Sequence, residues 1–179
     1  MPLSDEDMYS IMGPTSMAPD ELGKIKQPTR PKKQYYSWDH FHTLVGEIKK
    51  KVETTPNIIV SIGKGGSIPG VILAEHFECN NLNLGLKSYK GQERGTIHEY
   101  QGIKCFEGLK DANILIVDDI ADSGETLKYA VSKLKGNGCE RVQTASVFYK
   151  PCSKFKPDYF AEEVEETTWI VQPWEPMEV

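Results

Sequence analysis

Two adjacent carboxylates and a turn of phosphate-binding size follow one apolar run, and this segment is the part of the chain best suited to chemistry. The run covers residues 113–117 (NILIV), carries no charge and is rich in β-branched residues, which is typical of a central strand in a parallel sheet. Asp118 and Asp119 follow it directly, and residues 123–126 (SGET) then begin a predicted helix. Because open α/β sheets bind ligands at the carboxyl ends of their strands, the pattern predicts an anion site beside an acid pair.

An acid pair beside an anion site fits a ligand that carries both vicinal hydroxyls and a phosphate. Carboxylates accept hydrogen bonds from ribose 2′- and 3′-hydroxyls, while the amide groups at a helix N-terminus bind a terminal phosphate. A phosphoribosyl group has both features. A strand followed by an acidic, solvated turn is the alternative interpretation, but the length of the pattern from residue 113 to Thr126 favours the phosphoribosyl site.

A second glycine-rich turn, residues 63–67 (GKGGS), follows the predicted strand 58–62. Glycines let backbone N–H groups approach an anion closely, and Lys64 adds positive charge. Alone, the turn is equally consistent with a plain connection from strand to helix. Together with the first turn, it predicts a second phosphate site at the same sheet edge, although the Walker pattern G-x-x-x-x-G-K-S/T is absent.

A third group of candidate residues lies near the C-terminus. Lys150 ends a predicted strand on the ligand edge, where its ammonium could donate to a carbonyl oxygen of a base. Trp169 could cover an aromatic ring, and Ile170 could supply an apolar wall. In the alternative interpretation, Lys150 is a surface residue and the tryptophans are core aromatics.

The order of the predicted elements indicates an α/β fold with a central parallel sheet flanked by helices. Strands alternate with helices, and that order favours parallel strands joined by helical crossovers. Residues 1–34 are rich in proline and polar residues without a sustained period, so they are predicted to form an extended arm before a domain at 35–179. The predicted helices cover residues 37–52, 68–77 and 125–135, and the predicted strands cover 58–62, 82–87, 113–117 and 142–149.

Composition indicates an ordinary single-domain enzyme. A chain of 179 residues with 39% hydrophobic content can bury one sizeable core. Its net charge of -5 disfavours nucleic acid as a partner. The four cysteines are widely spaced, which favours reduced thiols over a zinc or disulfide framework, and no apolar run is long enough to span a membrane, so we expect a cytoplasmic protein.

In order and spacing, these motifs resemble the type I phosphoribosyltransferases, and within them the purine branch of xanthine-guanine (6-oxopurine) phosphoribosyltransferases. The acidic signature fits any type I member, whereas the ending T-W-I-x-Q-P-W is specific to the purine branch. The resemblance implies a mobile loop from about residue 87 to residue 101 and a small C-terminal hood. The matching segments are YSWD (36–39), SIGKGGSIPG (61–70), SY (88–89), NILIVDDIADSGET (113–126), YKP (149–151) and TWIVQPWE (168–175).

The resemblance also implies roles for individual residues. Asp118 and Asp119 match acids that bind ribose and associate with Mg²⁺, and Asp122 matches the residue placed at purine N7. The purine site would comprise Asp122, Lys150 at O6, Trp169 and Ile170. The phosphoribosyl pyrophosphate site would comprise Lys64, Gly65, Gly66, Asp118, Asp119, Ile120, Ala121, Asp122, Ser123, Gly124, Glu125 and Thr126.

The implied reaction transfers the 5-phosphoribosyl group from phosphoribosyl pyrophosphate to N9 of guanine, xanthine or hypoxanthine, releases pyrophosphate and serves purine salvage. Asp118, Asp119 and Asp122 would be the catalytic residues, and Ser88, Tyr89 and Arg94 would close over the site from the mobile loop. Two alternatives stay open: an enzyme of the same fold that acts on another base, and a regulator that binds phosphoribosyl pyrophosphate without catalysis. The resemblance further implies a homo-oligomer, either dimer or tetramer.

Overall fold

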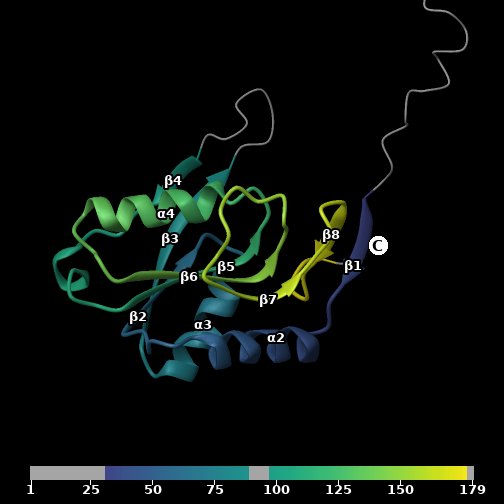
Figure 1. Cartoon of the computed structure of the whole chain (residues 1–179), viewed down its shortest axis with the longest axis horizontal. Coiled ribbons are helices and arrows are strands. Elements are labelled where there is room, and N and C mark those ends of the chain that lie inside the picture. Colours follow the sequence, from purple (N-terminus) through teal and green to yellow (C-terminus); the bar gives the residue numbers. More distant parts are fainter. Residues whose placement is uncertain (1–30, 89–96, 177–179) are drawn as a thin grey trace, which may run out of the picture. The chain divides into compact units, whose positions relative to one another are not determined.

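The computed structural model describes residues 31–88 and 97–176 (Figure 1). The described elements, in chain order, are β1 (Lys32–Tyr35), α2 (Trp38–Lys51), β2 (Ile58–Ile62), α3 (Ser67–Phe77), β3 (Asn80–Ser88), β4 (Ile97–Gln101), the 3₁₀ helix η2 (Glu107–Leu109), β5 (Ile114–Ala121), α4 (Glu125–Gly136), β6 (Val142–Tyr149), β7 (Tyr159–Glu163) and β8 (Thr168–Val171). No helix within these residues is long and apolar enough to cross a membrane.

A six-stranded sheet forms the centre of the domain, with strand order β4-β3-β2-β5-β6-β7. The strands from β3 to β7 in this order run parallel, whereas β4 is antiparallel to β3. In the middle of the sheet, Ile116 of β5 pairs with Val60 on one side and Thr144 on the other. The parallel α/β fold predicted from the sequence is confirmed, and the parallel strands end at a shared edge.

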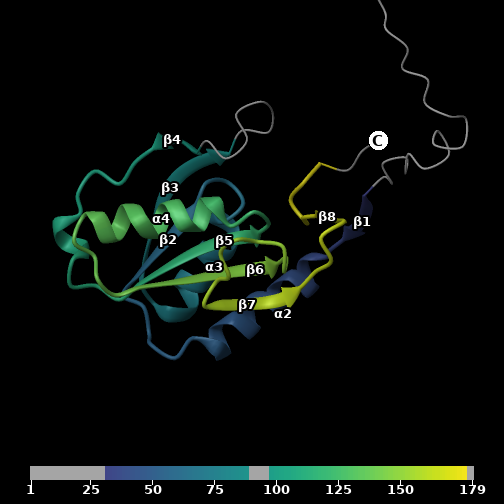
Figure 2. The same cartoon turned by 45° about the horizontal axis from the view of Figure 1, so that its top comes forward.

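Helices cover both faces of this sheet because β5 is apolar on both sides. Leu115 and Val117 pack in the core that includes buried residues of α2 and α3, whereas Ile114 and Ile116 pack in the core beneath α4. Figures 1 and 2 show α4 on one face and the other two helices on the opposite face. This two-sided burial holds the central strand firmly, so the residues at its carboxyl end have a rigid support.

Ser37 is the N-cap residue of the first long helix, α2. Ser37 Oγ accepts a hydrogen bond from the His40 N–H at 3.2 Å. One face of α2 is fully apolar and buried against the sheet, and it comprises Phe41, Leu44, Val45 and Ile48. Because these positions recur at helical spacing, the sequence pattern was sufficient to locate this helix.

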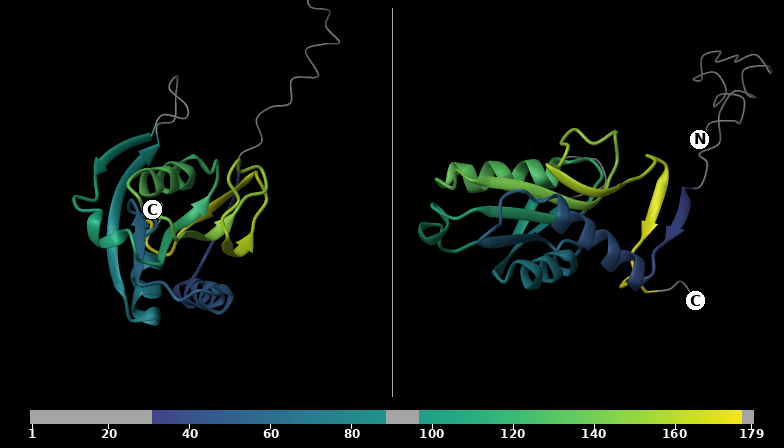
Figure 3. Two further views of the ribbon diagram at one scale, coloured as in Figure 1. Left: turned by 60° about the vertical axis from the view of Figure 1, so that its left-hand side comes forward. Right: turned by 60° about the horizontal axis from the view of Figure 1, so that its bottom comes forward.

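A second, two-stranded sheet forms a hood from both ends of the domain (Figure 3). β1 pairs in parallel with β8, and Gln34 lies opposite Ile170. Residues 32–34, which the sequence pattern assigned to the arm, therefore belong to a strand of the hood. Tyr36 fastens the hood to the main sheet, because its O–H donates to Glu162 Oε1 at 2.7 Å and its ring packs on Phe148 with 4.6 Å between centroids.

The segment predicted as a mobile loop is in part a strand, which corrects the expected range of residues 87–101. Lys87 and Ser88 complete β3, and residues 97–101 form β4. Glu99 anchors β4 to α4, because its carboxylate accepts from Lys133 Nζ at 2.9 Å and from the Tyr129 O–H at 3.1 Å. The hydrogen bond from Lys133 lowers the pKa of Glu99 and keeps the carboxylate charged.

Candidate active site

A cavity of about 760 Å³ opens at the carboxyl ends of β2 and β5, where the sequence predicted a ligand site. Its wall includes the acid pair and both glycine-bearing turns. Of the predicted site residues, the cavity is lined by Lys64, Gly65, Asp118, Asp119, Ile120, Ala121, Asp122, Ser123, Gly124, Glu125 and Thr126. One pocket thus brings together all the predicted phosphoribosyl pyrophosphate residues except Gly66, which is buried beside it.

Asp118 is buried and Asp119 is partly buried at the carboxyl end of β5. Asp118 is only 8% exposed, and the Asp119 N–H donates to Asp118 Oδ1 at 2.9 Å. Burial, followed by the negative charge of Asp119, raises the pKa of Asp118 well above its ordinary value, and burial also raises the pKa of Asp119. Neither carboxylate has an ion pair with another residue in the described part of the chain.

A buried acid pair without a protein cation is suited to a divalent metal ion that arrives with a phosphate ligand. Residues 31–88 and 97–176 contain no group of three His, Cys, Asp or Glu side chains arranged to hold a metal. Mg²⁺ is commonly bound through one or two carboxylates together with substrate phosphates, and so does not require such a group. Asp118 and Asp119 therefore fit the Mg²⁺ that the sequence resemblance implies.

The turn between β2 and α3 presses its backbone against the acid pair. Gly63 has φ +53 and donates its N–H to Leu84 O at 2.8 Å. A Cβ atom at Gly65 would overlap the carboxylate of Asp119, so only glycine allows this close approach. Lys64 between them is exposed at the cavity wall, where its ammonium can reach an anion. All peptide bonds of the described residues are trans.

The turn between β5 and α4 leaves the start of the helix open to an anion. Gly124 takes the N-cap position with φ +77, and no side chain caps the helix from there. The segment after β6 supports this turn, since the Lys154 N–H donates to Ser123 O at 3.1 Å. The Lys154 ammonium lies 3.4 Å from Glu125 Oε1 and also lines the cavity, which the sequence pattern did not indicate.

Two of the predicted purine contacts lie next to each other. The Lys150 ammonium is 3.1 Å from Asp122 Oδ1, and Lys150 is only 8% exposed although it is charged. The backbone N–H of Lys150 donates to Ala121 O at 3.1 Å, which ties the end of β6 to the end of β5. The ion pair therefore occupies the margin of the cavity, where Asp122 is a lining residue.

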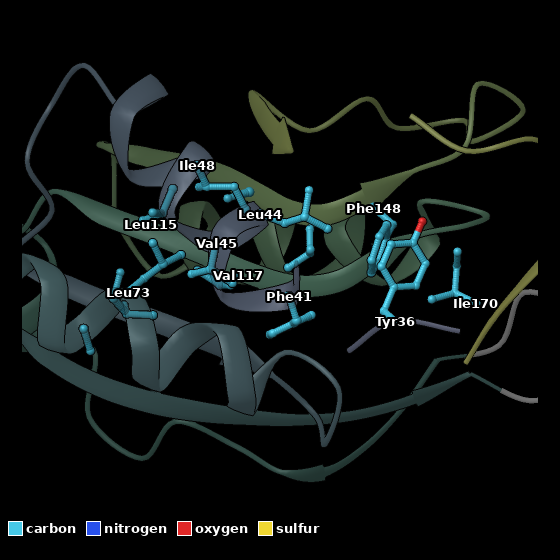
Figure 4. Packing of buried hydrophobic residues seen from close by; sticks show 14 of the residues in the cluster. Tyr36, Phe41, Leu44, Val45, Ile48, Leu73, Leu115, Val117, Phe148 and Ile170 are labelled. Carbon is cyan, nitrogen blue, oxygen red and sulfur yellow. The ribbon is translucent and has the colours of Figure 1, made fainter. Parts of the chain in front are cut away.

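The two residues predicted to hold the base from β8 point to opposite sides of that strand. Ile170 is 7% exposed and packs in the core with Tyr36 and Phe148 (Figure 4), whereas Trp169 is 47% exposed. Neither residue lines the cavity. The structure thus brings the acids and turns together but leaves Trp169 and Ile170 outside the enclosed part of the site.

One contact with the acid pair was missed by sequence reasoning. Gln172 Nε2, directly after β8, donates to Asp119 Oδ2 at 3.1 Å. The available signal was a glutamine within the otherwise apolar and aromatic ending T-W-I-V-Q-P-W. Of the predicted loop residues, Ser88 ends β3, while Tyr89 and Arg94 lie outside the described residues.

Comparisons with known proteins agree with this geometry. The family model for the phosphoribosyl transferase domain matches residues 32–178. The xanthine-guanine phosphoribosyltransferase of Gluconobacter oxydans is 34% identical over 119 residues, covering 65% of this chain and 67% of that protein. The crystal structure of a purine phosphoribosyltransferase from Pyrococcus horikoshii superposes with a TM-score of 0.74 at 30% identity, covering 82% of this chain and 97% of that one.

A third similarity is to the xanthine-guanine-hypoxanthine phosphoribosyltransferase of Helicobacter pylori. Its structure has a TM-score of 0.67 at 27% identity and covers 80% of this chain and 94% of that one. The family model spans nearly all of the described residues, and the relatives contain the same fold. The resemblance predicted from the motifs is confirmed: the chain belongs to the phosphoribosyltransferase family and is an enzyme of that family.

Proposed function

We propose that this enzyme transfers the 5-phosphoribosyl group from phosphoribosyl pyrophosphate to N9 of a 6-oxopurine and releases pyrophosphate, as a step of purine salvage. The relatives named for purine bases support this proposal. The observation that carries the choice of base is the Lys150–Asp122 pair. On a 6-oxopurine, O6 and N7 are neighbouring atoms on one edge of the ring, so a paired ammonium and carboxylate match that edge.

In this reaction, the bond between the ribose C1 and the pyrophosphate oxygen breaks while the lone pair of N9 forms the new bond. The Asp118 and Asp119 carboxylates accept hydrogen bonds from the two ribose hydroxyls and hold the ring in place. The open N-terminus of α4 takes the 5′-phosphate, and the Lys64 turn takes the departing pyrophosphate. Asp118 and Asp119 would hold a Mg²⁺ ion, which would supply positive charge to the diphosphate.

Asp122 and Lys150 act on the base. The Lys150 ammonium donates to O6, while the Asp122 carboxylate accepts the proton on N7 and so raises the electron density available at N9. Asp122 is exposed at the cavity margin, where an entering base can reach it.

Pyrophosphate release with a panel of bases tests the proposal. Purified protein, Mg²⁺ and phosphoribosyl pyrophosphate are mixed in turn with guanine, xanthine, hypoxanthine, adenine and uracil. We expect release with at least one of the three 6-oxopurines and none with uracil. Release with uracil alone would assign another base, and binding of the donor without release for any base would identify a regulator of the same fold.

Lys150→Ala is expected to reduce discrimination between 6-oxo and 6-amino purines. The variant removes a donor to O6 that is itself buried, a loss of about 1–3 kcal/mol for the 6-oxopurine only. Steady-state kinetics with guanine and adenine give the ratio of kcat/KM. Lys135→Ala, at an exposed position near the end of α4, is the control. If the Lys150 variant keeps the original ratio, Lys150 does not contact the base.

Two truncated chains distinguish the role of the N-terminal residues 1–30 from the role of the hood strand β1. Because β1 begins at Lys32, a chain that starts at Pro31 keeps the strand, and we expect its kcat to be unchanged. A chain that starts at Tyr36 removes the strand that pairs with β8, and we expect a lower Tm and a higher KM for the base. Kinetics, thermal melting and sedimentation of the two chains make the comparison. Lost kcat in a folded and equally assembled chain starting at Pro31 would show that residues 1–30 reach the active site.

A further inference from the structure

Gln172 connects the hood to the acid pair through a partly buried hydrogen bond. The residue directly follows β8 and is 4% exposed. Its Nε2 donates to Asp119 Oδ2 at 3.1 Å, across 53 positions of sequence. Among the described residues, this is the hydrogen bond that reaches the Asp119 carboxylate from the hood, so the two elements are directly joined.

The backbone of Gly65 lies beside the same carboxylate. A Cβ atom added at Gly65 would overlap Asp119 Oδ1, Oδ2 and Cγ, so the carboxyl group lies directly against the backbone of the turn between β2 and α3. Gln172 holds Oδ2 by hydrogen bonding. The orientation of Asp119 is therefore fixed by a steric contact from one element and a directional contact from another.

The remaining amide atom of Gln172 is buried without a partner. Gln172 Oε1 accepts no hydrogen bond within the described part of the chain. An unpaired buried acceptor is destabilising, whereas an apolar side chain of similar shape, such as methionine, would carry no such penalty. Packing alone therefore does not favour glutamine at this position, and the amide N–H donated to Asp119 is the contact that requires it.

We propose that Gln172 is a positioning residue that orients the Asp119 carboxylate to accept the ribose hydroxyls. This inference rests on the proposed function, since it assigns the ribose to the acid pair. It also joins two parts of the site, because Gln172 directly follows β8, the strand that carries Trp169 and Ile170, which the sequence resemblance assigns to the base. The position of β8 and the orientation of the Asp119 carboxylate are then coupled through the Gln172 side chain.

Nucleotide binding without turnover tests this role. The probes are guanosine 5′-monophosphate and its 2′,3′-dideoxy counterpart, measured by calorimetry with Mg²⁺ and without pyrophosphate. Wild-type protein should prefer the ribonucleotide, because only that probe bonds to the acids. In Gln172→Met this preference should fall by about tenfold or more, the smaller end of what a hydrogen bond to a charged group contributes. The affinity for the dideoxy probe should stay near the wild-type value.

Gln34→Met is the matched control. Gln34 also lies in the hood, and its Nε2 donates to Tyr36 Oη at 2.5 Å, so the variant loses a glutamine hydrogen bond without touching Asp119. It should keep the ribonucleotide preference. If Gln172→Met does not fold, Gln172→Glu preserves the shape but places a carboxylate against Asp119, and it should also lose the preference.

The possible outcomes are distinct. An unchanged preference in the folded Gln172 variant, or an equal loss in the Gln34 variant, would overturn the positioning role and leave the proposed function intact. Equal binding of both probes by the wild-type protein would remove the ribose role of Asp119 and overturn both. A preference lost only in the Gln172 variants supports the inference.

Discussion

Replacing both acids, in Asp118→Asn with Asp119→Asn, is expected to lower kcat/KM by about 10³-fold, the scale on which preorganised electrostatic groups contribute to catalysis. Both carboxylates line the cavity, and neither forms an ion pair within the described residues, so their charge is available to the ligand and to Mg²⁺. Asparagine keeps the size of each side chain but removes the charge. Pyrophosphate release measures the loss, and Asp111→Asn, at an exposed position, is the control for a simple change of charge.

The same double variant is expected to be more stable than the wild-type protein at neutral pH. Burial raises the folded-state pKa of Asp118 well above its ordinary value, so keeping this group ionised destabilises the fold. That destabilisation is absent below the unfolded-state pKa of about 3.9, grows as the pH rises from there toward the folded-state pKa, and is complete above the folded-state pKa. The gain in Tm of the variant should therefore be largest at neutral pH and should shrink on acidification.

Thermal melting at pH 7 and near pH 4 measures this difference. A double variant that is inactive and more stable would show that the acids are maintained for function at the expense of stability. A variant that is inactive because it is unfolded would leave the catalytic interpretation without support. Unaltered turnover in a folded double variant would rule out the proposed site.

The elements that sequence reasoning located well are those whose local pattern and burial agree. The strands predicted at 58–62 and 142–149 have the same bounds in the structure, and the predicted helix from residue 125 begins there. Continuous apolar runs and helical spacing specify these elements, because their side chains pack against the two main cores.

The strands that sequence reasoning missed depend on distant partners. β1 and β8 are four residues each and pair with each other across the whole domain, so neither has a local pattern long enough to identify it. β4 is an edge strand held by the contacts of Glu99 with α4. Strand pairing of this kind depends on tertiary contacts, so a short stretch of sequence gives little indication of it.

The residues of the candidate site also fall into those that the sequence predicted and those that it did not. The acids and glycine turns follow directly after long, well-patterned strands, so their convergence at one edge was predictable. The contacts of Lys154 and Gln172 were not, because each reaches the site from a segment that only the folded chain brings near. The outward side of Trp169 and the inward side of Ile170 follow from the register of β8, which the sequence did not indicate.

Gly65→Ala is expected to lower kcat/KM by about 10²-fold, because a displacement of about 1 Å at a catalytic group has an effect of this size. The new methyl group would occupy the space of the Asp119 carboxylate and force it away from its present position. Backbone strain is not the cause, since Gly65 is not among the residues with positive φ. The change therefore tests the position of the acid while its charge is retained.

Gly46→Ala in α2 provides a matched control for this variant. An added Cβ there meets nothing within 4 Å, so the variant should keep full activity and gain up to about 1 kcal/mol of stability from the higher helix propensity of alanine. Kinetics and thermal melting of both variants make the comparison. Loss of activity in a folded Gly65→Ala protein, with Gly46→Ala unaffected, would show that catalysis requires the Asp119 carboxylate in this exact place. Wild-type kcat/KM in Gly65→Ala would instead mean that the Asp119 carboxylate can move by the width of a methyl group without loss of activity. The close approach of Gly65 to Asp119 would then have no catalytic role.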